Sequence, residues 1–256
     1  MNVYWLEQTE VDVPTDNDWL SANEAACLSG MRFAKRSTDW RLGRWTAKRS
    51  LSVGLDVPAH PHVFRKIEIC AAPSGAPEAF FDSQPAPVTI SLSHRCGIAA
   101  CAVAMSSVKI GCDLEMIEPR SDAFVADYFT IEEQALVAHA SATDRDRLLA
   151  LLWSGKESAL KALREGLRLD TRSVIVIPCA TSFDLNGWSQ LRVRFTGGRY
   201  AGDRYIGDRH PGDQIFHGWW QQADGIVRTV VAAPPPDPPI RLRFPNYVPD
   251  AASPCA

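Results

Sequence analysis

A short apolar stretch, Val108–Leu114, constrains this chain most, because it alternates like a β-strand and yet leads into a pair of acids. Alternate side chains of a strand point to the same face, so Gly111, Asp113 and Glu115 share one face. Adjacent carboxylates repel unless a cation lies between them, and a glycine on their face leaves room for a ligand. The pattern fits a cation or ligand site, and it fits equally a strand that ends in a solvated loop.

A second segment adds an acid and two lysines on a predicted helix. Leucines recur at helical spacing over Leu148–Leu163, so Trp153, Glu157 and Lys161 share one helix face and Lys156 lies beside it. Alone, this pattern also fits a solvated Glu–Lys pair on a surface helix, with Trp153 in the core. Together, the two segments supply the carboxylates and lysines that hold a magnesium ion against a diphosphate. An enzyme is therefore the first hypothesis.

The two segments resemble the paired motifs of one enzyme family. Ile110–Glu115 (IGCDLE) is similar to the G-x-D-x-E motif of 4'-phosphopantetheinyl transferases, and Trp153–Lys161 (WSGKESALK) to their W-x-x-K-E-x-x-x-K motif. Ser91–His94 resembles the S-x-S-H segment of the family, Gly43–Lys48 its early G-R helix, and Phe129–Glu133 the stretch between its main motifs. The likeness is to the larger, monomeric type, which activates synthetases such as that of surfactin.

The pattern of predicted elements indicates an α+β fold. Helices are predicted near residues 21–28, 38–53, 131–139 and 145–164, and strands near 3–6, 63–69, 88–92, 98–105, 108–114, 174–177, 191–195, 215–221 and 226–232. The resemblance implies a pseudo-dimer of two similar α+β halves with the active site in the cleft between them. We place the halves at residues 1–107 and 108–233, and interpret the proline-rich segment 234–256 as an extended tail.

The resemblance also implies an activity. It predicts transfer of the 4'-phosphopantetheine arm of coenzyme A to a serine hydroxyl of an apo acyl or peptidyl carrier protein, with release of adenosine 3',5'-bisphosphate. Asp113, Glu115 and Glu157 are carried over as Mg2+ ligands, and Lys161 as a contact of the diphosphate, with Lys156 as a second candidate. Glu157, or a water that it holds, is predicted to take the proton of the serine.

Other residues are predicted to bind coenzyme A. Ser93 and His94 match the segment that contacts a coenzyme A phosphate in the family. Arg44 and Lys48, at i and i+4 of one helix, are candidates for the 3'-phosphate, with a surface charge stripe as the alternative. Where many members have Gly-Lys-Pro this chain has Gly75-Ala76-Pro77, so that lysine is absent.

Composition limits the function classes. A net charge of −3 with 22% charged residues predicts a soluble globular protein and argues against nucleic acid as a partner. The stretch 32–49 is locally basic, which fits either a solvated helix face or the phosphates of a small ligand. Seven cysteines without a C-x-x-C pair disfavour disulfides and zinc. With neither a signal-peptide pattern nor a membrane-length apolar run, we expect a cytoplasmic protein. The resemblance implies a monomer.

Two matters stay open from the sequence. The stretch Pro119–Thr130, with Phe124 and Tyr128, offers apolar side chains either to a carrier-protein helix or to the core. Rival functions are a coenzyme A or nucleotide-binding module without turnover and a Mg2+-dependent diphosphate hydrolase. Retained affinity without turnover identifies the module, and product release without a carrier identifies the hydrolase.

Overall fold

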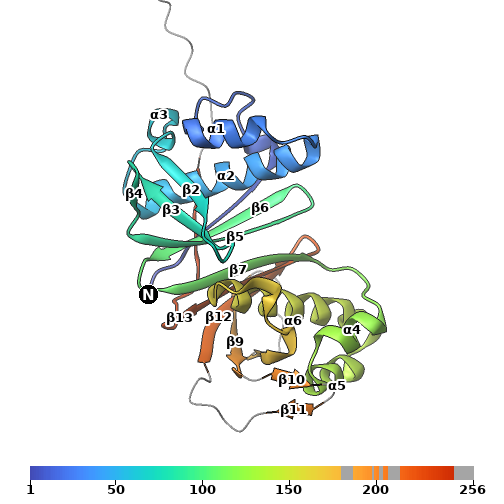
Figure 1. Ribbon diagram of the computed structural model, residues 1–256. Helices are drawn as coiled ribbons and strands as arrows, with labels where there is room; N and C mark the ends of the chain where they lie inside the picture. Colours follow the sequence, from blue (N-terminus) through green and yellow to red (C-terminus); the bar gives the residue numbers. More distant parts are fainter. Residues whose placement is uncertain (180–186, 198, 202–203, 207–213, 245–256) are drawn as a thin grey trace, which may run out of the picture.

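The computed structural model describes residues 1–179, 187–197, 199–201, 204–206 and 214–244. Two α+β halves are stacked on each other, and strand β7 runs along the boundary between them (Figure 1). Helices pack on sheets that are antiparallel, apart from one short parallel edge strand, which confirms the predicted α+β class. The division at residues 107/108 and 233/234 stays a prediction.

The first half holds two sheets beneath its helices. One sheet has the order β14-β1-β6-β5 and the other β2-β3-β4. Its elements are β1 (Tyr4–Thr9), α1 (Ala22–Ser29), α2 (Ala34–Gly54), α3 (Pro61–Phe64), β2 (Ile67–Ala71), β3 (Pro77–Phe81), β4 (Gln84–Pro85), β5 (Val88–Arg95) and β6 (Ile98–Met105).

The second half has one larger sheet, of order β7-β13-β12-β9-β8, with helix α6 packed on it. Its elements are β7 (Lys109–Met116), α4 (Asp122–Tyr128), α5 (Ile131–His139), α6 (Ala142–Ala162), β8 (Val174–Pro178), β9 (Ser189–Phe195), the pair β10 (Arg199–Ala201) and β11 (Arg204–Ile206), β12 (Gln214–Ala223) and β13 (Ile226–Ala233).

The two halves repeat one arrangement. The succession β1-β6-β5 corresponds to β7-β13-β12, and the pair β3-β2 corresponds to β9-β8, except that β3 has separated from β5 into a sheet of its own. In each half the long helix, α2 or α6, follows a short capped helix, α1 or α5, whose N-cap is a Ser or Thr in a capping box. This repetition supports the predicted pseudo-dimer.

A buried ion pair is repeated as well. In the first half Glu24 accepts from the backbone N–H of Ile69 and pairs with Lys48 at 2.5 Å. In the second half Glu133 accepts from the N–H of Val176 and pairs with Lys156 at 2.7 Å. Each lysine also donates to two buried carbonyls, and both lysine side chains are fully buried. Such pairs are stable only when every donor and acceptor is satisfied, which is the case here.

Backbone contact sets the spacing of α6 against β7. A Cβ built on Gly111 would lie 1.7 Å from the carbonyl oxygen of Ser158, so only glycine allows the helix to approach this closely. The backbone N–H groups of β7 also contact β5 of the first half, through serine hydroxyls. The Ser91 Oγ accepts from Cys112 N at 2.9 Å, and the Ser93 Oγ accepts from Leu114 N at 3.3 Å.

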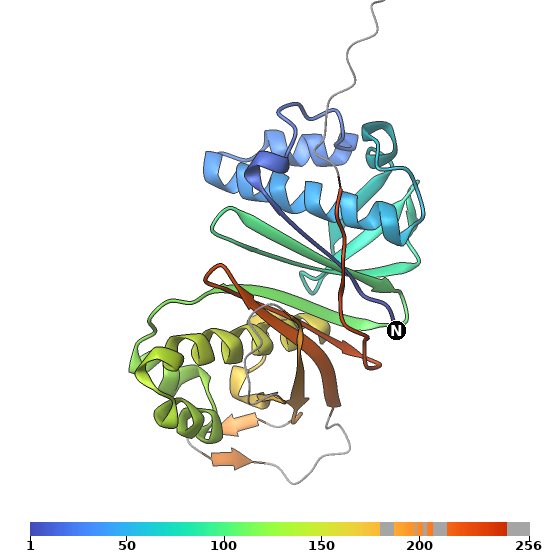
Figure 2. The same ribbon diagram turned by 180° about the vertical axis from the view of Figure 1, so that it is seen from behind.

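The segment after β13 crosses to the first half, where β14 (Ile240–Arg241) pairs parallel with β1 (Figure 2). The N–H of Leu242 donates to the carbonyl of Trp5, which extends this pairing. The described part of the proline-rich tail is thus extended, and it forms an edge strand. Residues 245–256 of that predicted tail lie outside the described residues.

Two local predictions differ from the structure. A strand was expected over 63–69, but Pro61 starts the short helix α3, the ring of His60 accepts from the N–H of His62 at its N-terminus, and the strand begins only at Ile67. Helix α4 was not anticipated. It begins after Ser121, whose hydroxyl accepts from the N–H of Phe124.

Candidate active site

Asp113 lies at the centre of the site, at the junction of the two halves. One oxygen, Oδ1, accepts from the hydroxyl of Ser93 at 2.8 Å and from the ammonium of Lys161 at 2.8 Å. The other, Oδ2, is buried and has no hydrogen-bond partner. A buried carboxylate oxygen without a partner is costly, so it provides an open ligand position for a cation.

Glu115 shares a face of β7 with Asp113 and is only 6% exposed. Its carboxylate pairs with Arg120 at 2.9 Å and lies 3.8 Å from Arg95. Burial raises the pKa of Glu115 to about 7, and the neighbouring Asp113 adds to the rise, while the two arginines lower it. The carboxyl group is therefore poised to change charge near neutral pH.

Helix α6 contributes Glu157 and Lys161, one turn apart. Burial, together with the nearby Asp113 charge, raises the pKa of Glu157. Burial lowers the pKa of Lys161, but Asp113, Cys112 and Glu157 outweigh it, and the net shift is upward. Lys161 is therefore held as a cation beside Asp113 and also donates to the carbonyl of Cys112 at 3.0 Å.

A cationic cavity of about 510 Å³ adjoins Ser93 on the side of the first half. Arg44, Ser93 and His94, which the sequence proposes as coenzyme A contacts, line this cavity together, and that role stays a prediction. Lys35 and Arg36 also line it, and the local basic stretch was the signal for them. Its aromatic members, Phe33 and Trp40, were missed, because nothing in their spacing separates them from core positions.

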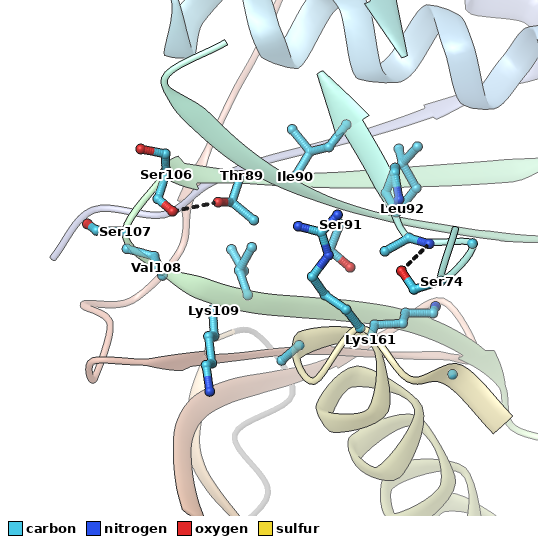
Figure 3. Close-up of a pocket in the computed structure, with 17 residues that line it drawn as sticks. Ser74, Thr89, Ile90, Ser91, Leu92, Ser106, Ser107, Val108, Lys109 and Lys161 are labelled. Carbon is cyan, nitrogen blue, oxygen red and sulfur yellow. Dashed lines mark hydrogen bonds between the residues drawn. The ribbon is translucent and has the colours of Figure 1, made fainter. Parts of the chain in front are cut away.

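A second cavity, of about 390 Å³, adjoins an earlier stretch of β5, Thr89–Leu92. Residues of both halves line it, including Thr89 and Ser91 from β5 and Lys161 from α6 (Figure 3). The loop at Gly75-Ala76-Pro77, which lacks the lysine of the family, forms part of its wall. Leu92 lines both cavities, so the two flank one strand next to Asp113.

The structure does not bring Lys48 and Lys156 to the site, contrary to the sequence-based expectation. The ammonium of Lys48 donates to the carbonyls of Trp19 and Phe64, and that of Lys156 to the carbonyl of Thr171 at 2.9 Å. With the glutamate pairing described above, neither ammonium has a donor free for a phosphate. Both belong to the interior of their halves.

Trp153 packs in an aromatic cluster, as expected from its place on the helix. Its ring contacts Phe124 edge-on, with centroids 5.1 Å apart, and Tyr128 at 5.3 Å. Phe129, fully buried, completes the group. The core alternative therefore holds for Phe124 and Phe129, whereas Tyr128 remains 40% exposed.

The carboxylates fit a hard, oxygen-liganded cation in chemical type. Among the described residues, however, no three His, Cys, Asp or Glu side chains are grouped closely enough to hold one metal ion. Glu115 is bound by Arg120 and Arg95, and Lys161 is bound to Asp113. The three acids do influence one another, since Asp113 raises the pKa of both Glu115 and Glu157.

The comparison with family models bears on the half that carries these acids. Residues 109–210 match the model described as the 4'-phosphopantetheinyl transferase superfamily. The resemblance to this superfamily is confirmed. The matched stretch includes β7 and α6, which carry both main motifs of these transferases. No curated protein matches the chain.

Solved structures of holo-[acyl-carrier-protein] synthases also match part of the chain. The Helicobacter pylori enzyme, in complex with coenzyme A, is 18% identical, with a TM-score of 0.33, over 41% of this chain and 99% of the other. The Bacillus anthracis enzyme, in complex with coenzyme A (3',5'-ADP), is 21% identical, with a TM-score of 0.34, over 41% of this chain and 94% of the other. Scores this low carry no argument about function.

No helix among the described residues combines the length and the apolar character that a membrane crossing requires.

Proposed function

We propose that this protein transfers 4'-phosphopantetheine from coenzyme A to a serine of an apo acyl or peptidyl carrier protein. The arrangement around Asp113 carries the proposal: an unpartnered buried oxygen, a lysine and a serine hydroxyl on the other oxygen, and two further acids. This set is suited to holding and neutralising a diphosphate while one of its phosphorus atoms is attacked.

Coenzyme A binding is proposed for the cationic cavity. Arg44, Lys35 and Arg36 there offer charge to the phosphate groups of the nucleotide, and His94 offers a ring nitrogen. The guanidinium of Arg44 lies over the ring of Trp40, 4.9 Å from its centroid, so this charge is held in a fixed place. The neighbouring cavity, which adjoins Thr89–Leu92 of β5, has room for the pantetheine arm.

Magnesium would be held by Asp113, Glu115 and Glu157. When bound, the ion supplies Lewis-acid stabilisation to the oxygens of the diphosphate. Lys161, held as a cation beside Asp113, would add positive charge for the diphosphate. Glu157, whose pKa is raised by burial, or a water that it holds, accepts the proton of the attacking serine.

Carrier docking is proposed for exposed apolar side chains next to the aromatic cluster. Tyr128, Ile131 and Leu136 are 40%, 60% and 50% exposed and come from α4 and α5. A helix of the carrier protein can cover such a surface. Cytoplasmic location, a monomeric state and the preference for Mg2+ stay predictions.

Intact-mass spectrometry of an apo carrier protein tests the proposal. The carrier is incubated with this protein, coenzyme A and Mg2+, and a gain of one phosphopantetheinyl group is expected. Glu157→Gln should slow the gain by about 10²–10³-fold, whereas Glu10→Gln, a matched change of an exposed glutamate, should leave its rate unchanged.

Two results would contradict the proposal. Coenzyme A binding without any mass gain across several carrier types identifies a binding module. Release of adenosine 3',5'-bisphosphate in the absence of a carrier identifies a hydrolase that uses water as its nucleophile.

A further inference from the structure

The first half contains a position equivalent to the candidate active site. Trp45, Lys48 and Ser50 on α2 have the same spacing as Trp153, Lys156 and Ser158 on α6, and the two lysines make the equivalent buried ion pairs. In this alignment Arg49 takes the place of Glu157 and Val53 that of Lys161. At this position the first half therefore has a cationic side chain where the second half has an acidic one.

Strand β1 likewise has uncharged residues at the positions where β7 has its two acids. Tyr4 packs with the core beneath α2, whereas Trp5 packs with the core between the halves. Because side chains alternate, Leu6 and Gln8 face the α2 side, as Asp113 and Glu115 face α6. Gln8 is 4% exposed, and its Oε1 is buried without a partner.

A cavity of about 440 Å³ lies at this place, and the C-terminal segment forms one wall of it. Gln8 and Arg49 line the cavity from the first half, and Arg241, Arg243 and Phe244 line it from the segment. The guanidinium of Arg49 lies 4.3 Å from the ring centroid of Phe244. The segment thus covers the position that is equivalent to the candidate active site.

The charge balance of this cavity is positive. Of its two acids, Glu7 is committed to Arg228 through two hydrogen bonds of 2.6 and 2.7 Å. Asp12 accepts from the backbone N–H of Thr9 at 2.8 Å. Asp12 keeps its charge and attracts Arg49, so the exposed guanidinium groups of Arg241 and Arg243 give the cavity its positive balance.

We infer that this cavity is a metal-independent binding site for a small phosphate-bearing anion. Guanidinium groups bind phosphate oxygens through paired hydrogen bonds. The unpartnered Oε1 of Gln8 requires a donor, and a protonated phosphate oxygen or a neighbouring hydroxyl of a phosphate monoester supplies one. Without the three acids, the site has no ligand set for magnesium. The inference stands on the geometry of the first half and does not depend on the proposed transfer activity.

Isothermal titration calorimetry with inorganic diphosphate, on the full chain in EDTA, tests the inference. Wild-type protein should bind the anion here and at the cationic cavity beside His94. Arg44→Gln is introduced to weaken binding at the cavity beside His94. In the Arg44→Gln protein, Arg241→Gln/Arg243→Gln should weaken diphosphate binding at the proposed site at least about tenfold, because two charge-assisted contacts are lost. Arg192→Gln/Arg194→Gln, on two exposed positions of β9, removes the same charge elsewhere and should change affinity less than about twofold.

Three outcomes would overturn the inference: no binding in EDTA, unchanged binding after loss of Arg241 and Arg243, or equal weakening by the β9 control. Thermal denaturation of each variant without ligand checks that the fold persists. Transfer activity of Arg241→Gln/Arg243→Gln should stay within about twofold of wild type, because these arginines lie outside the proposed catalytic machinery. A failure of the proposed function would therefore appear in the mass-spectrometric assay and leave this titration unaffected.

Discussion

The two halves of the molecule keep one scaffold and differ in chemistry at one pair of positions. Both retain a fully buried lysine that joins a capping-box glutamate to two carbonyls. On the next residue of each long helix, however, the second half has Glu157 and the first has Arg49. Residues that hold the fold are repeated, whereas the residues proposed to contact a ligand have diverged. One motif therefore contains both residues that stabilise the fold and residues proposed for chemistry. Only their position in the structure tells which is which.

Breaking the repeated ion pair should have the largest effect. Lys156→Met removes the lysine that pairs with Glu133, and Lys48→Met leaves Glu24 only its 3.6 Å contact with Arg44. Each change should lower the free energy of unfolding by about 3–5 kcal/mol, with Lys48→Met toward the lower end. Urea denaturation measures both. If the halves are equivalent, the losses are similar. A loss below about 1 kcal/mol for either variant would contradict the equivalence of the halves.

Substitution of Glu157 and of Arg49, the residues at which the two halves differ, tests the same comparison. Glu157→Gln should lower the rate of carrier modification by about 10²–10³-fold, the range seen when one preorganised electrostatic contact is removed. Arg49→Gln, at the equivalent place, should leave the rate within about twofold. Single-turnover rates from mass spectrometry measure both. Equal losses would show that the first half also takes part in the chemistry.

The pH dependence of stability should differ between Glu115 and its counterpart Gln8. The folded pKa of Glu115, about 7, lies above its usual value of 4.5. Its contribution to stability is therefore fully present below pH 4.5 and lost as pH rises through 7. In EDTA this loss should amount to about 2–3 kcal/mol. Glu115→Gln, which gives this position the amide of the first half, should flatten the curve in thermal denaturation, and Mg2+ should restore the stability of wild type at high pH.

The smallest effects are expected at the outer edges of β7 and β1. Ser91→Ala removes the hydroxyl that accepts from Cys112 N, and Leu242→Pro removes the N–H that donates to Trp5. Each should cost about 1 kcal/mol in urea denaturation. A loss of several kcal/mol from Leu242→Pro alone would show that the C-terminal segment contributes more to the first half than its short pairing suggests.

The sequence predicted the long helix α6 and strand β7 because their apolar periodicity is strong, and with them the faces that carry Asp113 and Glu157. It could not place Lys156, because one step along a helix turns a side chain by about a quarter of a circle, away from the site and into the core. Lys48 was misplaced for another reason: it shares a helix face with Arg44, but one turn further along α2 that face is buried, and its ammonium pairs with Glu24. Helix α3 was missed because the apolar residues after Pro61 also suit a strand. The repeat of the halves stayed hidden because only a few positions, such as Trp45 and Trp153, retain the same residue.

The contact between Gly111 and the backbone of Ser158 has a consequence for temperature dependence. Contact between backbone groups, and not between side chains that can repack, sets the distance between the acids of β7 and Glu157 of α6. Conservative core changes such as Leu149→Val or Leu152→Val should therefore lower the melting temperature while leaving the turnover of each folded molecule almost unchanged. Robustness of activity and robustness of the fold are in this way determined by different atoms.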